Sequence, residues 1–509
     1  MSQSLAFDLP MLQSSDGSPA LCLVTGATGY IGGRLIRELL LRGYRVRILA
    51  RHASRLKDHE WFSQVEIIEG DATSEAVLAE ALAGIDVAYY LLHSLMSKND
   101  FEAEESTMAG AFARLAKQAK VRRLIYLGGM VDQRPQSLSA HLQSRAEVGE
   151  ILRASGVPTI ELRAGVVIGS GSASFEMLRY LTERLPIMTT PKWVETRIQP
   201  IAIRDVLRYL VGAAALPSSV SGDYDIGGPN VYTYKDMMQQ YALSAGLRKR
   251  IIIPIPVLTP KLSSGWVGLV TPVPFTLAKR LVASLKNEVV ARNDEIRKLI
   301  PDPEGGLTEF PRAVQLALKR IKEANVETSW SNASFPGAPS DPLPTDPDWA
   351  GGSLYTDVRE VLTGESIEAI WARAESIGGD NGYSTATWAW RLRGIADKLL
   401  GGAGLRRGRR DPNHLMEGES LDFWRVEAIE RPTASNPVAL LRLRAEMVMP
   451  GLAWLEWKID KTMDGKTRVV QRAVYAPKGL LGHAYWWSVW PMHGFVFPSM
   501  VKYVATGQR

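Results

Sequence analysis

The chain has 509 residues, longer than one hydrophobic core usually supports, so its length predicts two or three domains. Apolar residues make up 46% and charged residues 22%, which excludes a wholly disordered, collagen-like or coiled-coil chain. The net charge of +6 is too small for a dedicated nucleic-acid-binding surface, so we expect no nucleic-acid partner. The single cysteine, Cys22, excludes an intrachain disulfide and fits a reducing cytoplasm, where we expect the protein.

Residues 1–19 contain Asp8 and Asp16 and lack the basic start and continuous apolar core of a secretory signal. We therefore expect a flexible tail. No run of 18 or more apolar residues occurs, which is the length that a membrane-spanning helix needs. Peripheral contact with the inner membrane, through residues 266–275 or the C-terminal aromatic residues, stays open.

Residues 20–325 are predicted to form an α/β domain. Six β-rich runs, beginning with LCLVTG and YRVRILAR, alternate with helical stretches up to about residue 228. This alternation predicts βαβ units in a doubly wound parallel sheet, and the almost wholly apolar runs indicate that both sheet faces are covered. Residues 231–325 turn mostly helical, which predicts a small cap on that domain.

The last third of the chain follows a different pattern. Residues 326–347 are rich in proline and are predicted to form a linker. From residue 348 to 509 we expect a strand, two helices, four strands and an aromatic-rich helix. Leu441 and Leu443 alternate with Arg442 and Arg444, as in a sheet with one buried face. A curved antiparallel sheet around a long C-terminal helix, an α+β architecture, is therefore predicted.

The strongest motif is a glycine-rich turn between the first strand and the first helix, which reads Thr25-Gly26-Ala27-Thr28-Gly29-Tyr30-Ile31-Gly32. Gly26 permits a tight turn, Gly29 lets backbone N–H groups approach a pyrophosphate, and Gly32 allows close packing of helix on strand. The helix N-terminus supplies positive dipole and free donors for phosphate groups. The turn predicts a dinucleotide site.

The end of the second strand indicates which dinucleotide binds. An acid there would hold the free ribose hydroxyl of NAD, but this chain has Arg47, Arg51 and His52 instead. Arg51 therefore favours NADP, with NAD as a possible cofactor, although a solvated arginine is the alternative. Asp71, after the third strand, is predicted to accept from the adenine amino group or to cap the next helix.

The N-terminal half resembles the atypical short-chain dehydrogenases/reductases, which include the NmrA-like sensors and an accessory subunit of respiratory complex I. The segments TGATGYIG, GDAT, YLLHS and YLGG carry this resemblance over about residues 20–322. It implies that the dinucleotide site is lined by Thr25 to Gly32, Arg51, Asp71, Ala72, Leu92 and His93. The whole chain resembles a bacterial fusion of such a domain with a helix-grip domain of the polyketide-cyclase and Bet v 1 type.

The catalytic pair of typical superfamily members, Tyr-x-x-x-Lys, is replaced here by His141 and Arg145 at the same spacing. Such a pair would share a helix face, with His141 as a proton donor and Arg145 as an anchor for ribose or phosphate. Arginine cannot be deprotonated, so the replacement changes the chemistry. A non-catalytic His141 is the alternative. Other polar residues with both a functional and an ordinary interpretation are Ser144, Glu147 and His93.

Two further clusters allow more than one interpretation. The run Arg406–Arg410 is interpreted as a solvated loop, and no metal site is predicted because His483 and His493 lack supporting ligands. The C-terminal aromatic residues either line an apolar ligand cavity or fill a core: Trp454, Trp457, Tyr485, Trp486, Trp487, Trp490, Phe495 and Phe497.

Two functional hypotheses follow. The first is an NADP(H)-dependent oxidoreductase acting on an apolar or carbonyl-bearing small molecule, with the C-terminal domain binding that molecule or a partner. The second is a non-catalytic dinucleotide sensor or assembly factor, which the missing Tyr-x-x-x-Lys pair favours.

Overall fold

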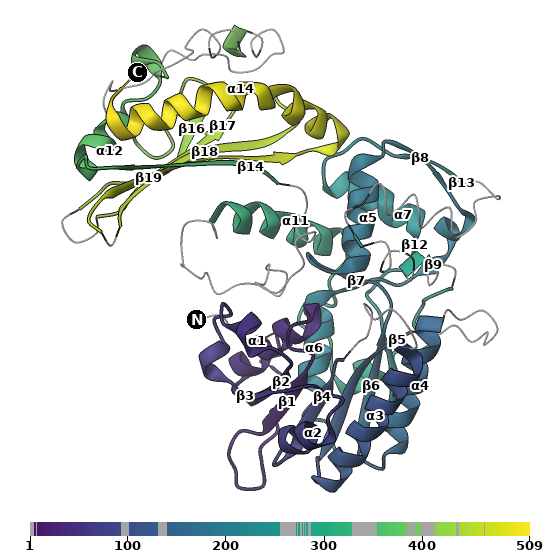
Figure 1. The fold of residues 1–509 in the computed structure, drawn as a ribbon. Coiled ribbons are helices and arrows are strands. Elements are labelled where there is room, and N and C mark those ends of the chain that lie inside the picture. The colour runs from purple at the N-terminus through teal and green to yellow at the C-terminus, as the bar shows by residue number, and fades with distance from the viewer. Residues whose placement is uncertain are drawn as a thin grey trace. The chain divides into compact units, whose positions relative to one another are not determined.

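The computed structural model describes residues 5–92, 101–130, 140–254, 287–327, 354–383, 414–433 and 437–508, except 7 and 463, and single positions within 271–282 and 390–411. The chain divides into two compact units, one within residues 1–324 and the other within 353–509, and Figure 1 shows the elements of each. The predicted linker, 326–347, lies almost wholly outside the described residues.

The N-terminal unit is organised around a seven-stranded parallel sheet with the order β11-β6-β5-β4-β1-β2-β3. The strands are β1 (Leu21–Thr25), β2 (Arg45–Ala50), β3 (Glu66–Glu69), β4 (Val87–Tyr90), β5 (Arg123–Gly129), β6 (Thr159–Ala164) and β11 (Gly222–Ile226). The predicted doubly wound sheet is confirmed. The strand order reverses between β1 and β4, which is where such sheets bind ligands.

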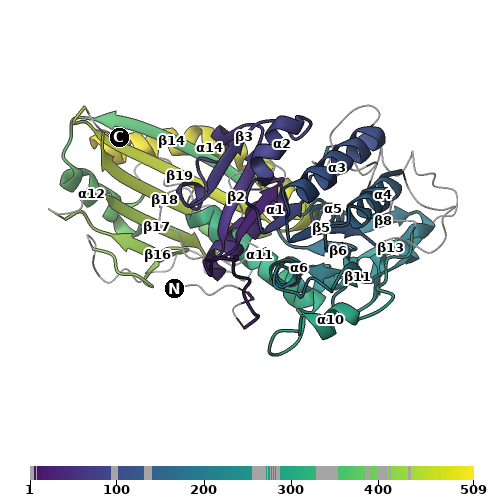
Figure 2. The ribbon, with the colours of Figure 1, turned by 90° about the horizontal axis from the view of Figure 1, so that it is seen from below.

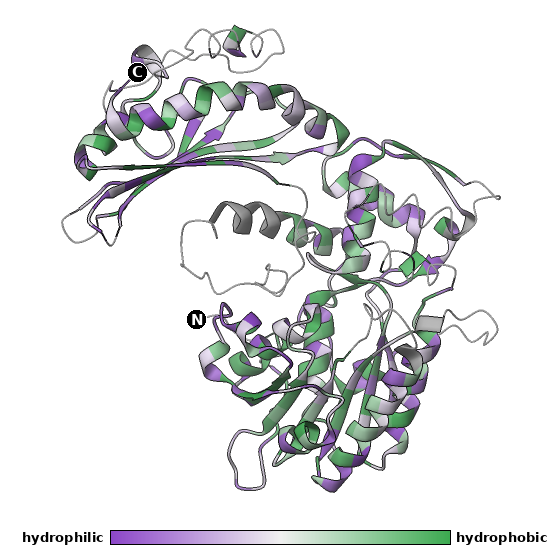
Figure 3. Ribbon diagram, in the orientation of Figure 1, coloured by the Kyte–Doolittle hydropathy of each residue, from purple (hydrophilic) through white to green (hydrophobic). Residues whose placement is uncertain are grey.

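Helices cover both faces of this sheet, as Figure 2 shows. One core joins the sheet to α1 (Tyr30–Arg42) and α6 (Ile203–Ala213). The other joins it to α2 (Glu75–Leu82), α3 (Phe101–Gln118) and α4 (Ala140–Ala154). Apolar residues on both strand faces are thereby buried, and the central strands are accordingly hydrophobic in Figure 3.

The structure corrects the prediction of a flexible N-terminal tail, because the described residues of this segment pack on the domain. Ala6 and Leu9 are buried in the core beside α1 and α6. The Arg208 guanidinium donates to both carboxylate oxygens of Asp8, at 2.6 and 2.7 Å. Buried apolar side chains and a bidentate ion pair offset the entropy lost when this segment becomes ordered. No periodic pattern in the sequence predicts these contacts.

The predicted cap, 231–325, shares one core with the earlier helix α5 (Ala173–Arg184), and its own α7 (Tyr234–Ser244) and α11 (Phe310–Glu327) complete that core. The same region contains a parallel strand pair that was not predicted, β8 (Ile187–Thr190) with β13 (Ile251–Pro254). The remaining short elements are β7 (Val167–Ile168), β9 (Arg197–Ile198), β10 (Ile201–Ala202), β12 (Tyr232–Thr233) and α10 (Glu295–Leu299). Most of residues 266–275, a candidate segment for membrane contact, lies outside the described residues.

The C-terminal unit is a six-stranded antiparallel sheet with the order β14-β19-β18-β17-β16-β15, packed against α12 (Ile367–Glu375) and α14 (Gly479–Thr506). The strands are β14 (Tyr355–Thr363), β15 (Ser420–Leu421), β16 (Trp424–Glu430), β17 (Ala439–Ala445), β18 (Gly451–Lys461) and β19 (Thr467–Pro477). The predicted sheet and C-terminal helix are confirmed.

The helix α14 runs for 28 residues and contains Pro491 and Pro498. The helix continues through both prolines, although each lacks the N–H that an interior turn uses. None of the helices among the described residues is long and apolar enough to cross a membrane.

Candidate functional sites

The glycine turn joins β1 to α1 at the carboxyl edge of the parallel sheet. Gly26 has a φ of +73°, and a Cβ there would lie 2.5 Å from the Leu91 carbonyl oxygen. A Cβ on Gly32 would lie 2.2 Å from the Gly26 carbonyl oxygen, so α1 packs directly on the turn. Gly29 precedes α1 in an extended conformation. Three glycines therefore bring the N-terminus of α1 to the edge where the strand order reverses.

Thr25 fixes this edge from inside the protein. Its buried hydroxyl donates to the Tyr89 carbonyl at 2.9 Å and accepts from the Leu91 N–H at 3.0 Å. The end of β1 is thus tied to the end of β4, beside the predicted site residue Leu92. The side chain of Thr25 positions the turn. His93 lies outside the described residues.

Tyr30 and Ile31 begin the helix, and Tyr30 packs against the segment that follows β7. A Cβ on Gly169 would lie 2.3 Å from the Tyr30 hydroxyl oxygen. The Arg34 guanidinium lies 4.2 Å above the Tyr30 ring and donates to the Ser170 carbonyl at 3.3 Å. Arg34 is buried, and sequence reasoning missed it because charged residues on a surface helix are usually solvated.

The two arginines near the end of β2 have different surroundings. Arg47 donates to the Glu66 carboxylate at 2.8 and 3.0 Å and to the Ala83 carbonyl at 2.7 Å. Arg51 follows the strand and is exposed to solvent. Of these two, Arg51 is the exposed one, and its contact with a cofactor stays a prediction. Sequence reasoning missed Glu69 on the neighbouring strand, whose carboxylate accepts from the Ala53 N–H at 3.2 Å.

Asp71 lies in the turn between β3 and α2, next to the buried Ala72. Its carboxylate accepts from the backbone N–H and the hydroxyl of Thr73, at 2.9 and 2.8 Å. The Thr73 backbone N–H is the largest cause that lowers the pKa of Asp71, and the charge of Arg51 also lowers it. Asp71 therefore bears a negative charge at neutral pH and shapes the turn before α2.

The predicted pair His141 and Arg145 lies on α4, where the spacing puts both on one helix. The Arg145 guanidinium donates to the Leu127 carbonyl and lies 5.6 Å from the centre of the Tyr126 ring. Arg145 is thus anchored to the end of β5. The side chain of His141 lies outside the described residues, so its role stays a prediction.

The two other polar residues of this helix differ in their surroundings. The buried hydroxyl of Ser144 donates to a carboxylate oxygen of Glu105 on α3, at 2.5 Å. That bond joins two helices within the covering layer. Glu147 is exposed, as expected for a charge on an outer helix face.

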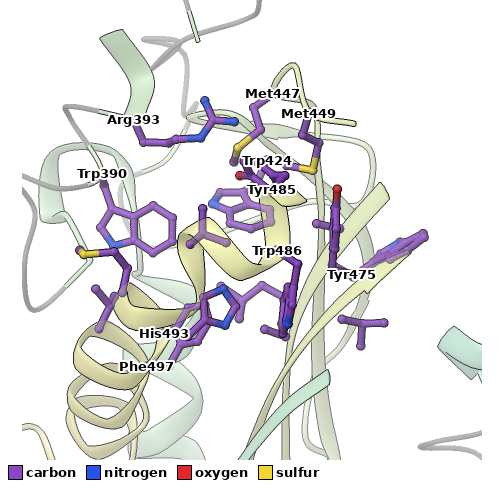
Figure 4. Close-up of a pocket in the computed structure, with 18 residues that line it drawn as sticks. Trp390, Arg393, Trp424, Met447, Met449, Tyr475, Tyr485, Trp486, His493 and Phe497 are labelled. Atoms are coloured by element: carbon purple, nitrogen blue, oxygen red, sulfur yellow. The ribbon is translucent and has the colours of Figure 1, made fainter. Parts of the chain in front are cut away.

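A second candidate site lies in the C-terminal unit, as a cavity of about 180 Å³ between α14 and the sheet. Figure 4 shows aromatic side chains around the cavity, together with the side chains of His493 and Arg393. Its principal lining residues are Trp390, Arg393, Trp424, Met447, Met449, Trp454, Tyr475, Tyr485, Trp486, His493 and Phe497. The run Arg406–Arg410 lies outside the described residues.

The C-terminal aromatic residues divide into three groups. Trp454, Tyr485, Trp486 and Phe497 line the cavity. Trp457 belongs to the core, where its indole N–H donates to the Gln471 side chain at 2.9 Å. The others are largely exposed, at 61%, 41% and 60% for Trp487, Trp490 and Phe495. Cavity and core are therefore both present, and membrane contact through the exposed group stays a prediction.

Each of the two units contains a segment that matches a known family. Residues 26–173 match the family model described as "NAD(P)H-binding". Residues 349–500 match the model described as "Protein of unknown function (DUF2867)". The N-terminal unit is thus an NAD(P)-binding domain of the atypical short-chain dehydrogenase/reductase type, fused to a domain of unknown function. The predicted nicotinamide dinucleotide is confirmed as the cofactor class. Among the described residues, no cluster of three or more His, Cys, Asp or Glu side chains suits a metal ion.

Individual proteins resemble half of the chain or slightly more. A ceramide reductase of Caulobacter vibrioides is 27% identical over 50% of this chain and 81% of its own length. The mitochondrial NADH dehydrogenase [ubiquinone] 1 alpha subcomplex subunit 9 of Mus musculus is 24% identical over 50% of this chain and 67% of its own length. The Citrobacter sp. triphenylmethane reductase, solved with NADP(H), is 19% identical over 58% of this chain and 99% of that one, with a TM-score of 0.47.

Proposed function

We propose that this protein is an NADP(H)-dependent oxidoreductase that transfers hydride between the cofactor and an apolar or carbonyl-bearing small molecule. The observation that carries the proposal is the glycine turn at the point where the strand order reverses. There the turn and the N-terminus of α1 offer backbone N–H groups to a pyrophosphate, Gly26 and Gly32 allow the turn to pack closely, and Gly29 leaves room for the phosphates.

The residues around this turn have distinct roles in the proposal. The N-terminus of α1 holds the pyrophosphate, and the exposed Arg51 makes a charge-assisted contact with the 2′-phosphate. The negatively charged Asp71 accepts from the adenine amino group. When bound, the cofactor supplies or accepts the hydride. His141, in the first turn of α4, exchanges the proton with the carbonyl oxygen, while Arg145 holds α4 against the end of β5. Similarity to a protein named ceramide reductase supports an apolar substrate.

Titration of the full chain with NADPH and NADH by calorimetry tests the cofactor assignment. We expect NADPH to bind about tenfold more tightly, which corresponds to one charge-assisted contact of roughly 1.4 kcal/mol. Arg51→Ala should abolish this preference. Arg45→Ala is the matched control, because Arg45 lies at the other end of the same strand and bonds to Glu66 at 3.1 Å. Equal affinities in the wild type, or an unchanged preference in Arg51→Ala, would contradict the assignment.

A non-catalytic dinucleotide sensor is the second candidate. It is favoured by Arg145, whose guanidinium donates to a backbone carbonyl at the position where typical members carry a catalytic lysine. NADPH oxidation measured with a panel of carbonyl and quinone compounds separates the two functions. An oxidoreductase should turn over at least one compound, and His141→Ala should abolish that turnover. A sensor should bind NADPH, become more resistant to proteolysis and show no turnover.

A further inference from the structure

The parallel pair β8 and β13 turns isoleucine side chains toward solvent. Ile187 on β8 is 59% exposed, and Ile251 and Ile253 on β13 are 55% and 48% exposed. Ile251 is paired with Ile187, so the three side chains leave the sheet on one face, which we call the isoleucine face. Figure 1 shows the strand pair beside α5 and α7. Isoleucine in a strand normally packs into a core, so this exposed group is a candidate binding surface.

The opposite face of the same strands is buried. Met188 and Ile252 belong to the core that contains α5 and α7. Arg250 also points inward, because its Nε donates to the Thr182 carbonyl on α5 at 2.8 Å. The backbone carbonyl and N–H of Arg250 bond to the side chain of Gln239 on α7, at 2.7 and 3.0 Å. Two helices therefore hold the strand pair, and the isoleucine face is preformed.

The residues around the isoleucine face are basic. Residues 184–192 and 243–254 contain three arginines and two lysines and no acidic residue. Lys249 lies two positions before Ile251, and the residue between them is buried, so Lys249 lies on the outward side of the strand. Lys249 and Arg248 are both exposed. Apolar side chains and positive charge therefore occur together on this surface.

The acidic residue that directly precedes this basic stretch is engaged inside the unit. Glu183 accepts from the hydroxyl of the buried Tyr241 at 2.6 Å. Its carboxylate also lies 3.3 Å from Nε of the buried Arg179. The charge of Glu183 is therefore matched by Arg179, and it does not offset the exposed basic side chains.

We propose that the isoleucine face docks on a membrane surface that contains anionic lipids. The isoleucine side chains enter the apolar layer just below the headgroups, while Arg248 and Lys249 contact the lipid phosphates. A membrane offers negative charge and apolar chains in one plane, which matches both features of this surface. A second copy of this chain is disfavoured, because a symmetric dimer would place the same basic residues against one another.

Sedimentation of the full chain with lipid vesicles tests the proposal. No nucleotide is added, so the result is independent of the reductase proposal. One set of vesicles contains phosphatidylcholine alone, and the other contains three parts of it with one part of phosphatidylglycerol. We expect about tenfold tighter binding to the anionic vesicles, as basic residues near such a surface provide, and a smaller difference in high salt.

The apolar contribution is tested by the double variant Ile251→Ser with Ile253→Ser. Because both side chains point to solvent, the variant should fold, which circular dichroism checks. It should bind the anionic vesicles about tenfold more weakly, since two apolar side chains no longer enter the lipid. The matched control is Val358→Ser with Leu362→Ser, which removes two exposed apolar side chains from one face of β14. The control should bind as the wild type does.

The charged contribution is tested by Arg248→Gln with Lys249→Gln. This variant should lose about tenfold in affinity for the anionic vesicles and bind neutral vesicles as the wild type does. Arg55→Gln with Lys57→Gln, another exposed basic pair, is the control. No binding by the wild type, equal binding to both kinds of vesicle, or unchanged binding by the folded isoleucine variant overturns the proposal. So does a wild-type dimer in analytical ultracentrifugation that the isoleucine variant abolishes.

Discussion

The two candidate sites are built from different parts of the polypeptide. The turn proposed to hold the dinucleotide phosphates is formed by the backbone of one continuous segment, in which Gly26 and Gly32 have no room for a Cβ. The cavity of the C-terminal unit is formed by side chains from separate strands and α14, such as Trp454, Tyr475 and His493. A backbone site depends on local conformation and is written in a short motif, whereas a side-chain cavity depends on how distant segments pack.

The largest expected effect comes from adding a methyl group to the glycine turn, whose conformation depends on the backbone alone. Gly26→Ala should lower the free energy of unfolding by roughly 3 kcal/mol, because its Cβ would meet the Leu91 carbonyl at 2.5 Å in a backbone with positive φ. Gly84→Ala is the matched control: φ is +71° there, but nothing lies within 4 Å. It should cost only about 1 kcal/mol. Equal losses in denaturant unfolding would show that the close approach to Leu91 is unimportant.

Gly29→Val separates ligand binding from folding. A Cβ at Gly29 lies 3.1 Å from the Gly26 carbonyl and the backbone is extended, so we expect the variant to fold. Its branched side chain occupies the space where backbone N–H groups meet the pyrophosphate. NADPH affinity should fall about 100-fold, or roughly 2.7 kcal/mol, with a smaller loss in Gly29→Ala. Calorimetry that finds unchanged affinity in a folded variant would remove the turn from the site.

Within the C-terminal unit, buried and exposed tryptophans should differ in their contribution to stability. Trp457→Phe should cost about 2 kcal/mol, because it leaves a gap in the core and removes the donor to Gln471. Trp487→Phe should change stability by less than about 0.5 kcal/mol, since the side chain is 61% exposed. Similar losses in urea unfolding would contradict the division of these residues into core and surface.

The smallest expected effect is a pH dependence that originates in His493. Its folded-state pKa is lowered from 6.5, mainly by burial. As the pH falls below 6.5, the unfolded imidazole takes up a proton before the folded one does, so the free energy of unfolding falls. Asp357, whose carboxylate lies 3.4 Å from Nδ1 of His493, Arg359 and the surrounding aromatic rings determine how far the free energy of unfolding falls. His493→Phe should have a flatter stability profile between pH 7 and pH 5, while a profile identical to that of the wild type would show that His493 does not titrate as proposed.

The sequence by itself determined the local architecture of both units. Apolar runs of strand length, the helices between them and the glycines at 26, 29 and 32 each depend on neighbouring residues, so pattern and motif sufficed for the parallel sheet and the dinucleotide turn. The alternation in β17 predicted one buried sheet face for the same reason. The short, polar β11 was missed because its pairing with β6 at the edge of the sheet, and not its own sequence, makes it a strand.

The tertiary structure decided which polar and aromatic side chains meet. From the sequence, Arg47 and Arg51 are both candidates for a cofactor contact near the end of β2. In the structure, Glu66 on the next strand binds Arg47 and not Arg51. The segment before β1 packs because Arg208, far along the chain, bonds to Asp8. The pairing of His493 with Asp357 likewise requires α14 to lie against β14. Such contacts depend on the register of distant segments, which no local pattern encodes.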